Sequence, residues 1–162
     1  MDLWLLPLSG DHKSRPFVAT PANEFGGRIS PDGRWMAYTS DESGKDEVYV
    51  TSYPEPRDST RISSDGGTQV EWRRDGRELF YRAPDRKLMA VPIRGAATFE
   101  PGTPQALFEL PFNPPAWIQG GVDQRVYAPS SHGQRFLIGF PVAEGFSAPI
   151  SVVLDWTATL KK

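Results

Sequence analysis

The chain contains no cysteine, and none of its 162 residues belongs to an apolar run long enough to form a membrane helix. Disulfide bonds and thiolate chemistry are therefore excluded, although this absence does not fix the compartment. A membrane helix needs about 18 apolar residues, and the apolar opening Met1–Leu8 is much shorter. It also lacks a basic start and a small-residue cleavage site, so we predict neither a signal peptide nor membrane insertion by this segment.

A surplus of positive charge is also missing. The 18 Lys and Arg residues are offset by 20 Asp and Glu, which gives a net charge of −2. Nucleic-acid-binding proteins carry clustered basic faces, and no polybasic stretch occurs, so we expect no nucleic-acid partner. The only two histidines, His12 and His132, stand far apart in the sequence. With no cysteine and no His-x3-His pair, the pattern predicts no metal site and no cofactor.

Proline and glycine, in contrast, are abundant, at 16 and 15 residues. Such a composition is typical of many short strands joined by tight turns. Hydrophobic residues make up 38% and charged residues 23%, which supports a packed core. The composition indicates an all-β fold.

One turn-and-strand unit recurs along the chain. It occurs at Ser30–Arg34, at Arg73–Arg77 and, in degraded form with His132 replacing Asp, at Ser130–Gln134. The glycines of the first two copies, Gly33 and Gly76, are 43 positions apart. An x-Asp-Gly turn provides the positive φ that a tight hairpin needs, and alternating apolar residues follow each copy. A period of about 40–45 residues is typical of four-stranded propeller blades.

The repeat predicts a single partial β-propeller domain over residues 1–162. We expect antiparallel four-stranded blades, with two outer strands in 2–20, full blades at 27–63 and 68–110, and three strands in 124–156. These thirteen strands make about three and a quarter blades, an incomplete ring, because closed rings have about 4–8 blades. The Pro-rich stretch Pro111–Gly121 is an insertion, and Ile150–Leu154 is the last strand. The chain starts inside a strand, so we expect a fragment of a longer protein.

The motifs Ser-Pro-Asp-Gly-Arg-Trp, Trp-Arg-Arg-Asp-Gly-Arg-Glu-Leu-Phe-Tyr and Val-Val-Leu-Asp-Trp-Thr resemble TolB-like and WD-repeat-like propellers. More narrowly, the chain resembles the C-terminal propeller segment of bacterial serine/threonine protein kinases. That resemblance implies a sensing or interaction module, either extracytoplasmic in a membrane-anchored kinase or cytoplasmic. The sequence has no Gly-rich kinase loop, no His-Arg-Asp and no Asp-Phe-Gly, so any kinase activity would belong to a different domain.

Catalytic patterns are weak. The nearest match to a Gly-x-Ser-x-Gly nucleophile elbow is Gly145–Pro149, in which Pro replaces the final Gly. Ser130, Ser131 and His132 adjoin in one turn and do not make a triad. The acidic loop Asp41–Glu47 lacks the ligand spacing of a calcium loop, so we interpret it as a solvated hairpin loop with Gly44 at positive φ.

Propellers bind ligands at the loops over one face and in the central channel, where the innermost strands turn alternate side chains inward. The candidate ligand-binding residues are Asn23, Glu24, Phe25, Arg28, Asp65, Gln69, Glu71, Arg73, Trp117 and Arg125, with Ser30 and Tyr127 as further channel positions. Strand aromatics are expected to pack between blades instead; they are Trp35, Tyr38, Tyr49, Trp72, Phe80 and Tyr81.

We therefore predict a non-catalytic interaction or sensing module, not an enzyme, that binds a protein partner or a second copy of itself. The alternative is a propeller that gates or binds a small ligand or peptide for a hydrolase or lyase. Convergence of Glu24 with Asp65 over the channel would favour that alternative. Ring completion is expected either from missing N-terminal blades or from a homodimer, in which the Leu3–Leu8 strand lies near the partner's Ile150–Leu154 strand.

Overall fold

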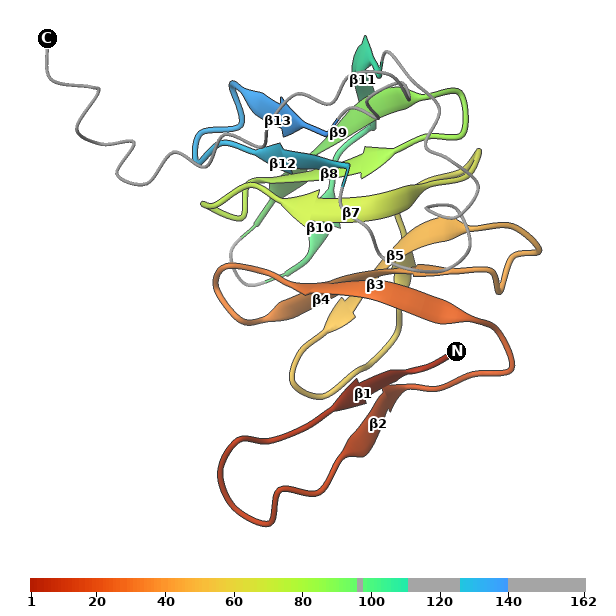
Figure 1. Ribbon diagram of the computed structural model, residues 1–162, viewed down its shortest axis with the longest axis vertical. Coiled ribbons are helices and arrows are strands. Elements are labelled where there is room, and N and C mark those ends of the chain that lie inside the picture. The colour runs from red at the N-terminus through yellow and green to blue at the C-terminus, as the bar shows by residue number, and fades with distance from the viewer. Residues whose placement is uncertain (96–97, 111–125, 140–162) are drawn as a thin grey trace, which may run out of the picture.

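A computed structural model describes residues 1–95, 98–110 and 126–139 of the chain (Figure 1). Within these ranges every strand pair is antiparallel and no helix occurs. The predicted all-β class with antiparallel sheets is therefore confirmed for the described residues. None of these ranges contains a helix long and apolar enough to cross a membrane.

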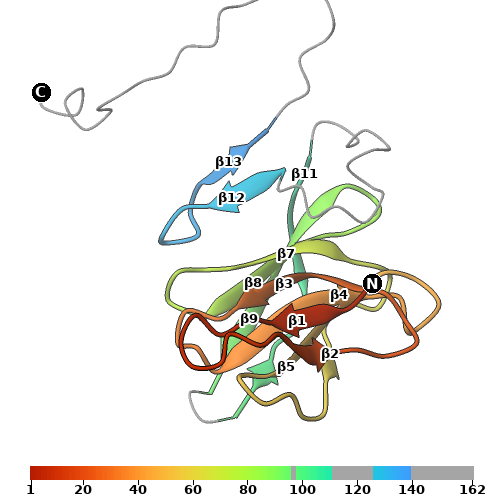
Figure 2. The same cartoon turned by 60° about the horizontal axis from the view of Figure 1, so that its bottom comes forward.

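The strands form four sheets that follow one another in chain order (Figures 1 and 2). The first sheet pairs β1 (Leu3–Leu5) with β2 (Arg15–Val18). The second runs β3 (Glu24–Ile29), β4 (Trp35–Ser40), β5 (Glu47–Ser52) and β6 (Thr60–Arg61). The third contains β7 (Thr68–Trp72), β8 (Glu78–Arg82), β9 (Lys87–Arg94), β10 (Glu100–Pro101) and β11 (Gln105–Glu109). The fourth pairs β12 (Tyr127–Pro129) with β13 (Phe136–Ile138).

The recurring turn, which is Asp-Gly in two copies and His-Gly in the third, joins the first two strands in each of the last three sheets. In the turn between β3 and β4, the Gly33 N–H donates to the Ser30 carbonyl at 2.9 Å, and Gly33 has a φ of +70°. Gly76 and Gly133 repeat both features, with φ values of +73° and +67°. The predicted hairpin geometry is thus confirmed, including the copy in which His132 replaces Asp.

Each pair of neighbouring sheets encloses an apolar cluster. Phe17, Met36, Tyr38 and Tyr49 lie between the first and second sheets, and Val48, Val50, Val70, Trp72 and Leu79 are among the residues between the second and third. Phe80, Leu88, Leu110, Val126 and Tyr127 lie between the third and fourth. The packing role predicted for the strand aromatics is confirmed, because five are buried and Trp35 packs half-buried against the middle cluster.

The structure differs from the expected strand map in two places. β3 begins at Glu24 and contains a bulge between Phe25 and Arg28, with Gly26 at a φ of +68°. Glu24 and Phe25 therefore belong to a strand, whereas the sequence placed them in a loop. The second difference is β10, a short extra strand that pairs with the end of β9, while β11 pairs with its start. The expected insertion at 111–121 and strand at 150–154 lie outside the described residues.

Candidate functional site

The first strands of three successive sheets, β3, β7 and β12, lie side by side, and we call their junction the inner-strand seam. It contains most of the residues predicted to face a channel. The Arg28 Nε lies 3.1 Å from a Glu71 carboxylate oxygen, and the Arg28 Nη1 donates to the Gly27 carbonyl at 3.0 Å. The two charged side chains are only 16% and 13% exposed. Opposite charges held this close neutralise each other, so the pair ties β3 to β7.

Two further side chains of the inner-strand seam donate hydrogen bonds to backbone carbonyls of the preceding sheet. The Trp72 indole N–H donates to the Arg28 carbonyl at 2.9 Å, and the Tyr127 hydroxyl donates to the Gln69 carbonyl at 2.6 Å. Gln69 itself has a φ of +56°, at a bulge of β7 between Thr68 and Glu71. The structure therefore brings Arg28, Gln69 and Glu71 together, and it uses them to join sheets.

Arg73, the other predicted channel residue on this side, is drawn into its own turn. Its guanidinium donates to Asp75 at 2.6 Å and to Glu78 at 2.8 Å. The hydrogen bond from Arg73 holds the pKa of Asp75 below its ordinary value, and the two acids raise the pKa of Arg73. Arg73 is therefore an internal clamp of the turn Arg73–Arg77.

The predicted loop residues occupy the opposite end of the strands. The Asn23 backbone N–H and side-chain amide donate to the Asp41 carboxylate at 2.8 and 2.7 Å, and this lowers the pKa of Asp41. Glu24 is fully buried and accepts a hydrogen bond from the Thr20 hydroxyl. Asp65 is exposed and accepts from the Ser64 hydroxyl at 3.3 Å. Glu24 and Asp65 thus have separate partners, and Phe25 lies half-buried on β3. Trp117 and Arg125 lie outside the described residues.

Glu47 is fully buried, whereas the sequence analysis interpreted it as part of the solvated loop Asp41–Glu47. Its Oε2 accepts from the Ser63 hydroxyl and from the Gly66 N–H, the latter at 3.0 Å. The Lys45 ammonium lies 3.4 Å from its Oε1. The two donors to Oε2 offset part of the cost of burying the carboxyl group, and they fix the connection from β6 to β7 against the start of β5. Gly44 does have the positive φ expected, +90°.

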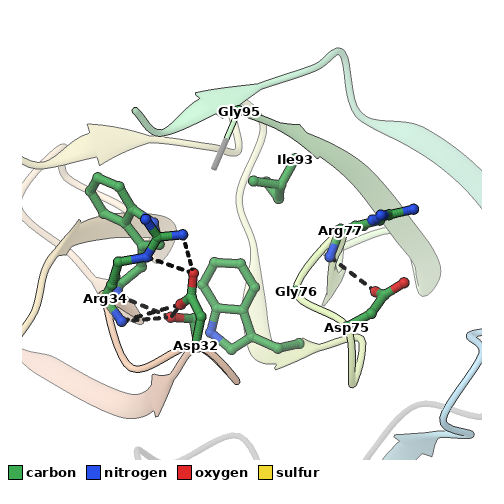
Figure 3. Close-up of a pocket in the computed structure, with 10 residues that line it drawn as sticks. Asp32, Arg34, Asp75, Gly76, Arg77, Ile93 and Gly95 are labelled. Atoms are coloured by element: carbon green, nitrogen blue, oxygen red, sulfur yellow. Dashed lines mark hydrogen bonds and ion pairs between the residues drawn. The ribbon is translucent and has the colours of Figure 1, made fainter. Parts of the chain in front are cut away.

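One of several concave features among the described residues is a cleft of about 340 Å³ at the first two Asp-Gly turns (Figure 3). We call it the turn cleft. Its lining residues are Ser30, Asp32, Arg34, Trp35, Trp72, Asp75, Gly76, Arg77, Ile93 and Gly95. The two turns come from different sheets, so the cleft exists only because the second and third sheets pack together.

The two sides of the turn cleft differ in how their arginines are held. The Arg34 guanidinium donates to the Asp32 carboxylate at 2.8 and 2.9 Å (Figure 3). Arg77 gives its backbone N–H to Asp75 at 3.0 Å, and within the described part of the chain its exposed side chain forms no hydrogen bond. Burial alone would raise the pKa of Asp32, but hydrogen bonds from Ser30 and Arg34 outweigh it and hold that pKa below its ordinary value.

Sequence reasoning missed the turn cleft and its arginines. A signal was present, because the first two repeats both read Asp-Gly-Arg, which puts Arg34 and Arg77 at equivalent positions. Equivalent positions in stacked sheets lie at one end of the stack, and Gly76 indeed approaches Pro31 of the neighbouring turn.

Among the described residues, acidic and histidine side chains do not gather into a metal centre. No group of three or more His, Asp and Glu side chains among them is placed to hold a metal ion. Ser130 accepts a hydrogen bond from the Arg135 N–H at 3.1 Å and so belongs to the frame of its turn. Comparison with known proteins finds no matching family model and no matching curated relative.

Proposed function

We propose that the chain is a segment of a β-propeller that acts as a non-catalytic, protein-binding module. Support comes from the sheets, which follow chain order and whose first strands lie side by side. The three repeated turns, at Gly33, Gly76 and Gly133, also lie at one end of the stack, where an added Cβ on Gly133 would lie 2.9 Å from the Arg73 side chain. A propeller repeats one sheet per unit around an axis in this way.

The composition of the turn cleft is the observation that supports a protein-binding role. Its walls combine Trp35 and Trp72 with Arg34 and Arg77. Tryptophan and arginine are the residue types most enriched at binding hot spots. The exposed Arg77 side chain provides donors for a carboxylate, and Asp32 and Asp75 provide acceptors. We therefore propose that the cleft receives a peptide segment of a partner that carries an acidic side chain.

A binding experiment with one matched control tests this proposal. A library of peptides rich in Asp or Glu, with Lys-rich peptides as the comparison, is titrated against the chain by calorimetry. Arg77→Ala is expected to weaken binding of the best acidic peptide at least about tenfold, since a charge-assisted hydrogen bond contributes about 1.5–3 kcal/mol. Arg74→Ala removes an exposed arginine next to the cleft but outside its lining, and is expected to change affinity less than about twofold.

Equal losses from both variants would contradict the assignment to the cleft, and an absence of peptide binding would contradict the proposed function. The alternative, a ligand-binding propeller of a hydrolase or lyase, depended on convergence of Glu24 and Asp65. Their separate partners give it no support. The kinase context and the bacterial source remain predictions from the resemblance.

A further inference from the structure

Among the described residues, the first and last sheets of the stack are incomplete. β1–β2 and β12–β13 contain two strands each, whereas β3–β6 contains four (Figure 1). One edge of β1 and one edge of β13 pair with no other strand of the described residues. An open strand edge presents unpaired N–H and C=O groups and is a template for pairing with another chain.

The two incomplete sheets correspond to opposite halves of the complete second sheet. β12–β13 repeats its first half, because Pro129 pairs with Phe136 as Ile29 pairs with Met36, a constant offset of 100 residues. The turn hydrogen bonds repeat with the same offset, at 2.9 Å in both copies.

The other half is repeated by β1–β2. Trp4 pairs with Pro16 as Tyr49 pairs with Arg61, and the offset is 45 residues for both strands. In the second sheet the halves join where β4 pairs with β5, with Ala37 opposite Val50. Transferred by these offsets, that pair becomes Leu137 on β13 opposite Leu5 on β1. Within the described part of the chain, each end sheet thus contains the half that the other one lacks.

The positions of the exposed apolar side chains on each face of β1 and β13 support this pairing. On β1, Leu3 and Leu5 pack on the second sheet, and Trp4 points the other way and is 56% exposed. On β13, Phe136 and Ile138 pack on the third sheet, and Leu137 is 77% exposed. Because side chains alternate across a strand, joining β13 to β1 in the stated register puts Trp4 on the face of Ile138 and Leu137 on the face of Leu5.

The neighbouring sheets leave matching apolar surface uncovered. Ile29 on β3 is 46% exposed, beside the position where the first sheet lacks its inner strands. Phe108 on β11 is 36% exposed, beside the position where the described part of the fourth sheet has no outer strands. A joined sheet would place Leu137 over Ile29 and Trp4 over Phe108.

We propose that the partner of these two edges is a second copy of this chain. β13 of each copy pairs with β1 of the other copy. A two-fold axis then relates two identical β13–β1 contacts, and both open edges are paired. The closed assembly has two complete sheets from each copy and two shared sheets, within the about 4–8 units of known rings. This inference rests on the propeller interpretation above and is independent of the turn cleft.

Solution mass is the first test. Light scattering across a concentration series should give twice the mass of the 18.0 kDa chain. Leu137→Asp introduces a charge at the proposed β13–β1 contact, at a side chain that is exposed in a single copy. The substitution is expected to raise the dimer dissociation constant at least about tenfold and to leave the circular dichroism spectrum unchanged. Leu8→Asp is the matched control, since Leu8 is 90% exposed and lies beyond β1; it should leave the mass unchanged.

A cysteine trap tests the register, because the chain contains no native cysteine. Leu5→Cys with Leu137→Cys puts two thiols on one face and opposite each other, and oxidation should give a covalent dimer on a non-reducing gel. Leu6→Cys with Leu137→Cys puts them on opposite faces and should not.

Three outcomes overturn the inference. A monomer at every concentration would leave the β13 edge to another segment, such as residues 150–154 of the same chain. An intrachain disulfide in the first cysteine pair would show closure within one copy, and masses growing beyond the dimer would show open head-to-tail association. Solution mass and peptide binding, measured on the same sample, separate this inference from the proposed function. A monomer that binds the acidic peptide contradicts only the dimer. A dimer that binds no peptide contradicts only the proposed role of the turn cleft.

Discussion

The guanidinium of Arg28 on β3 lies 3.1 Å from the carboxylate of Glu71 on β7, and so a largely buried ion pair joins the first strands of two neighbouring sheets. The chain holds a second ion pair of nearly equal length, 3.2 Å, between Arg15 and Glu55. Those side chains are 56% and 70% exposed. The two pairs have nearly equal lengths and different burial, which makes them a natural comparison.

Glu71→Gln should lower the free energy of unfolding by about 2–4 kcal/mol, because it removes the carboxylate charge that faces the Arg28 guanidinium in a site with little solvent. Glu55→Gln should change it by less than about 0.5 kcal/mol, as is typical of exposed pairs. Urea unfolding followed by tryptophan fluorescence measures both. Equal changes in the free energy of unfolding for the two substitutions would show that burial of the Arg28–Glu71 pair does not increase its contribution to stability.

Ser30→Ala should destabilise the chain more than the equivalent Ser130→Ala. The Ser30 hydroxyl donates to Asp32 at 2.6 Å and accepts from the Trp35 N–H at 2.9 Å, and the side chain is buried. Its loss should cost about 1–3 kcal/mol because the Trp35 N–H would lose its partner. The half-buried Ser130 has one such bond, at 3.1 Å, so its loss should cost less than about 1 kcal/mol. Thermal unfolding checks the order, and a reversed order would contradict it.

Gly66→Ala and Gly44→Ala separate backbone strain from steric clash. Both glycines have positive φ, +97° and +90°. A Cβ on Gly44 would meet nothing within 4 Å, whereas one on Gly66 would lie 2.5 Å from the Pro84 ring. Gly44→Ala should cost about 1–2 kcal/mol from conformation alone, and Gly66→Ala about 1–3 kcal/mol more from overpacking. Denaturant midpoints measure the difference, and equal costs would rule out the Pro84 contact.

Acid should destabilise the chain through Asp32 and Asp75, whose pKa values are lowered by folding. Their stabilising contribution is complete above the unfolded pKa, near 3.8, and is lost as the pH falls through the lower folded pKa. Asp32→Asn with Asp75→Asn should flatten the fall in unfolding free energy below about pH 4. Chemical unfolding at several pH values measures this slope. An unchanged slope in the double variant would assign acid sensitivity to other carboxylates.

Features that depend on neighbouring residues were predictable from the sequence. The turn at Ser30–Arg34 was anticipated because Asp-Gly itself dictates a positive φ and a tight hydrogen bond. The burial of Tyr38 and Tyr49 was predicted because bulky aromatic side chains at strand positions fill the space between packed sheets. The grouping of the strands into propeller blades remains a prediction.

Features that depend on sheet packing were not predictable. Glu47 was read as solvated because its partners, Ser63 and Gly66, come from a later segment. Arg28 and Glu71 were each proposed as channel residues, but nothing local indicated that they bind each other. The turn cleft needs two sheets in contact, which no single repeat encodes.

The three apolar clusters described above each lie between two sheets that are consecutive in the chain. Cohesion therefore passes from one unit to the next, as in a one-dimensional array with nearest-neighbour coupling. In such an array an interior sheet is supported from both sides and a terminal sheet from one. Loss of order begins at the termini and moves inward, so whatever covers the outermost sheets also sets how long the interior sheets survive.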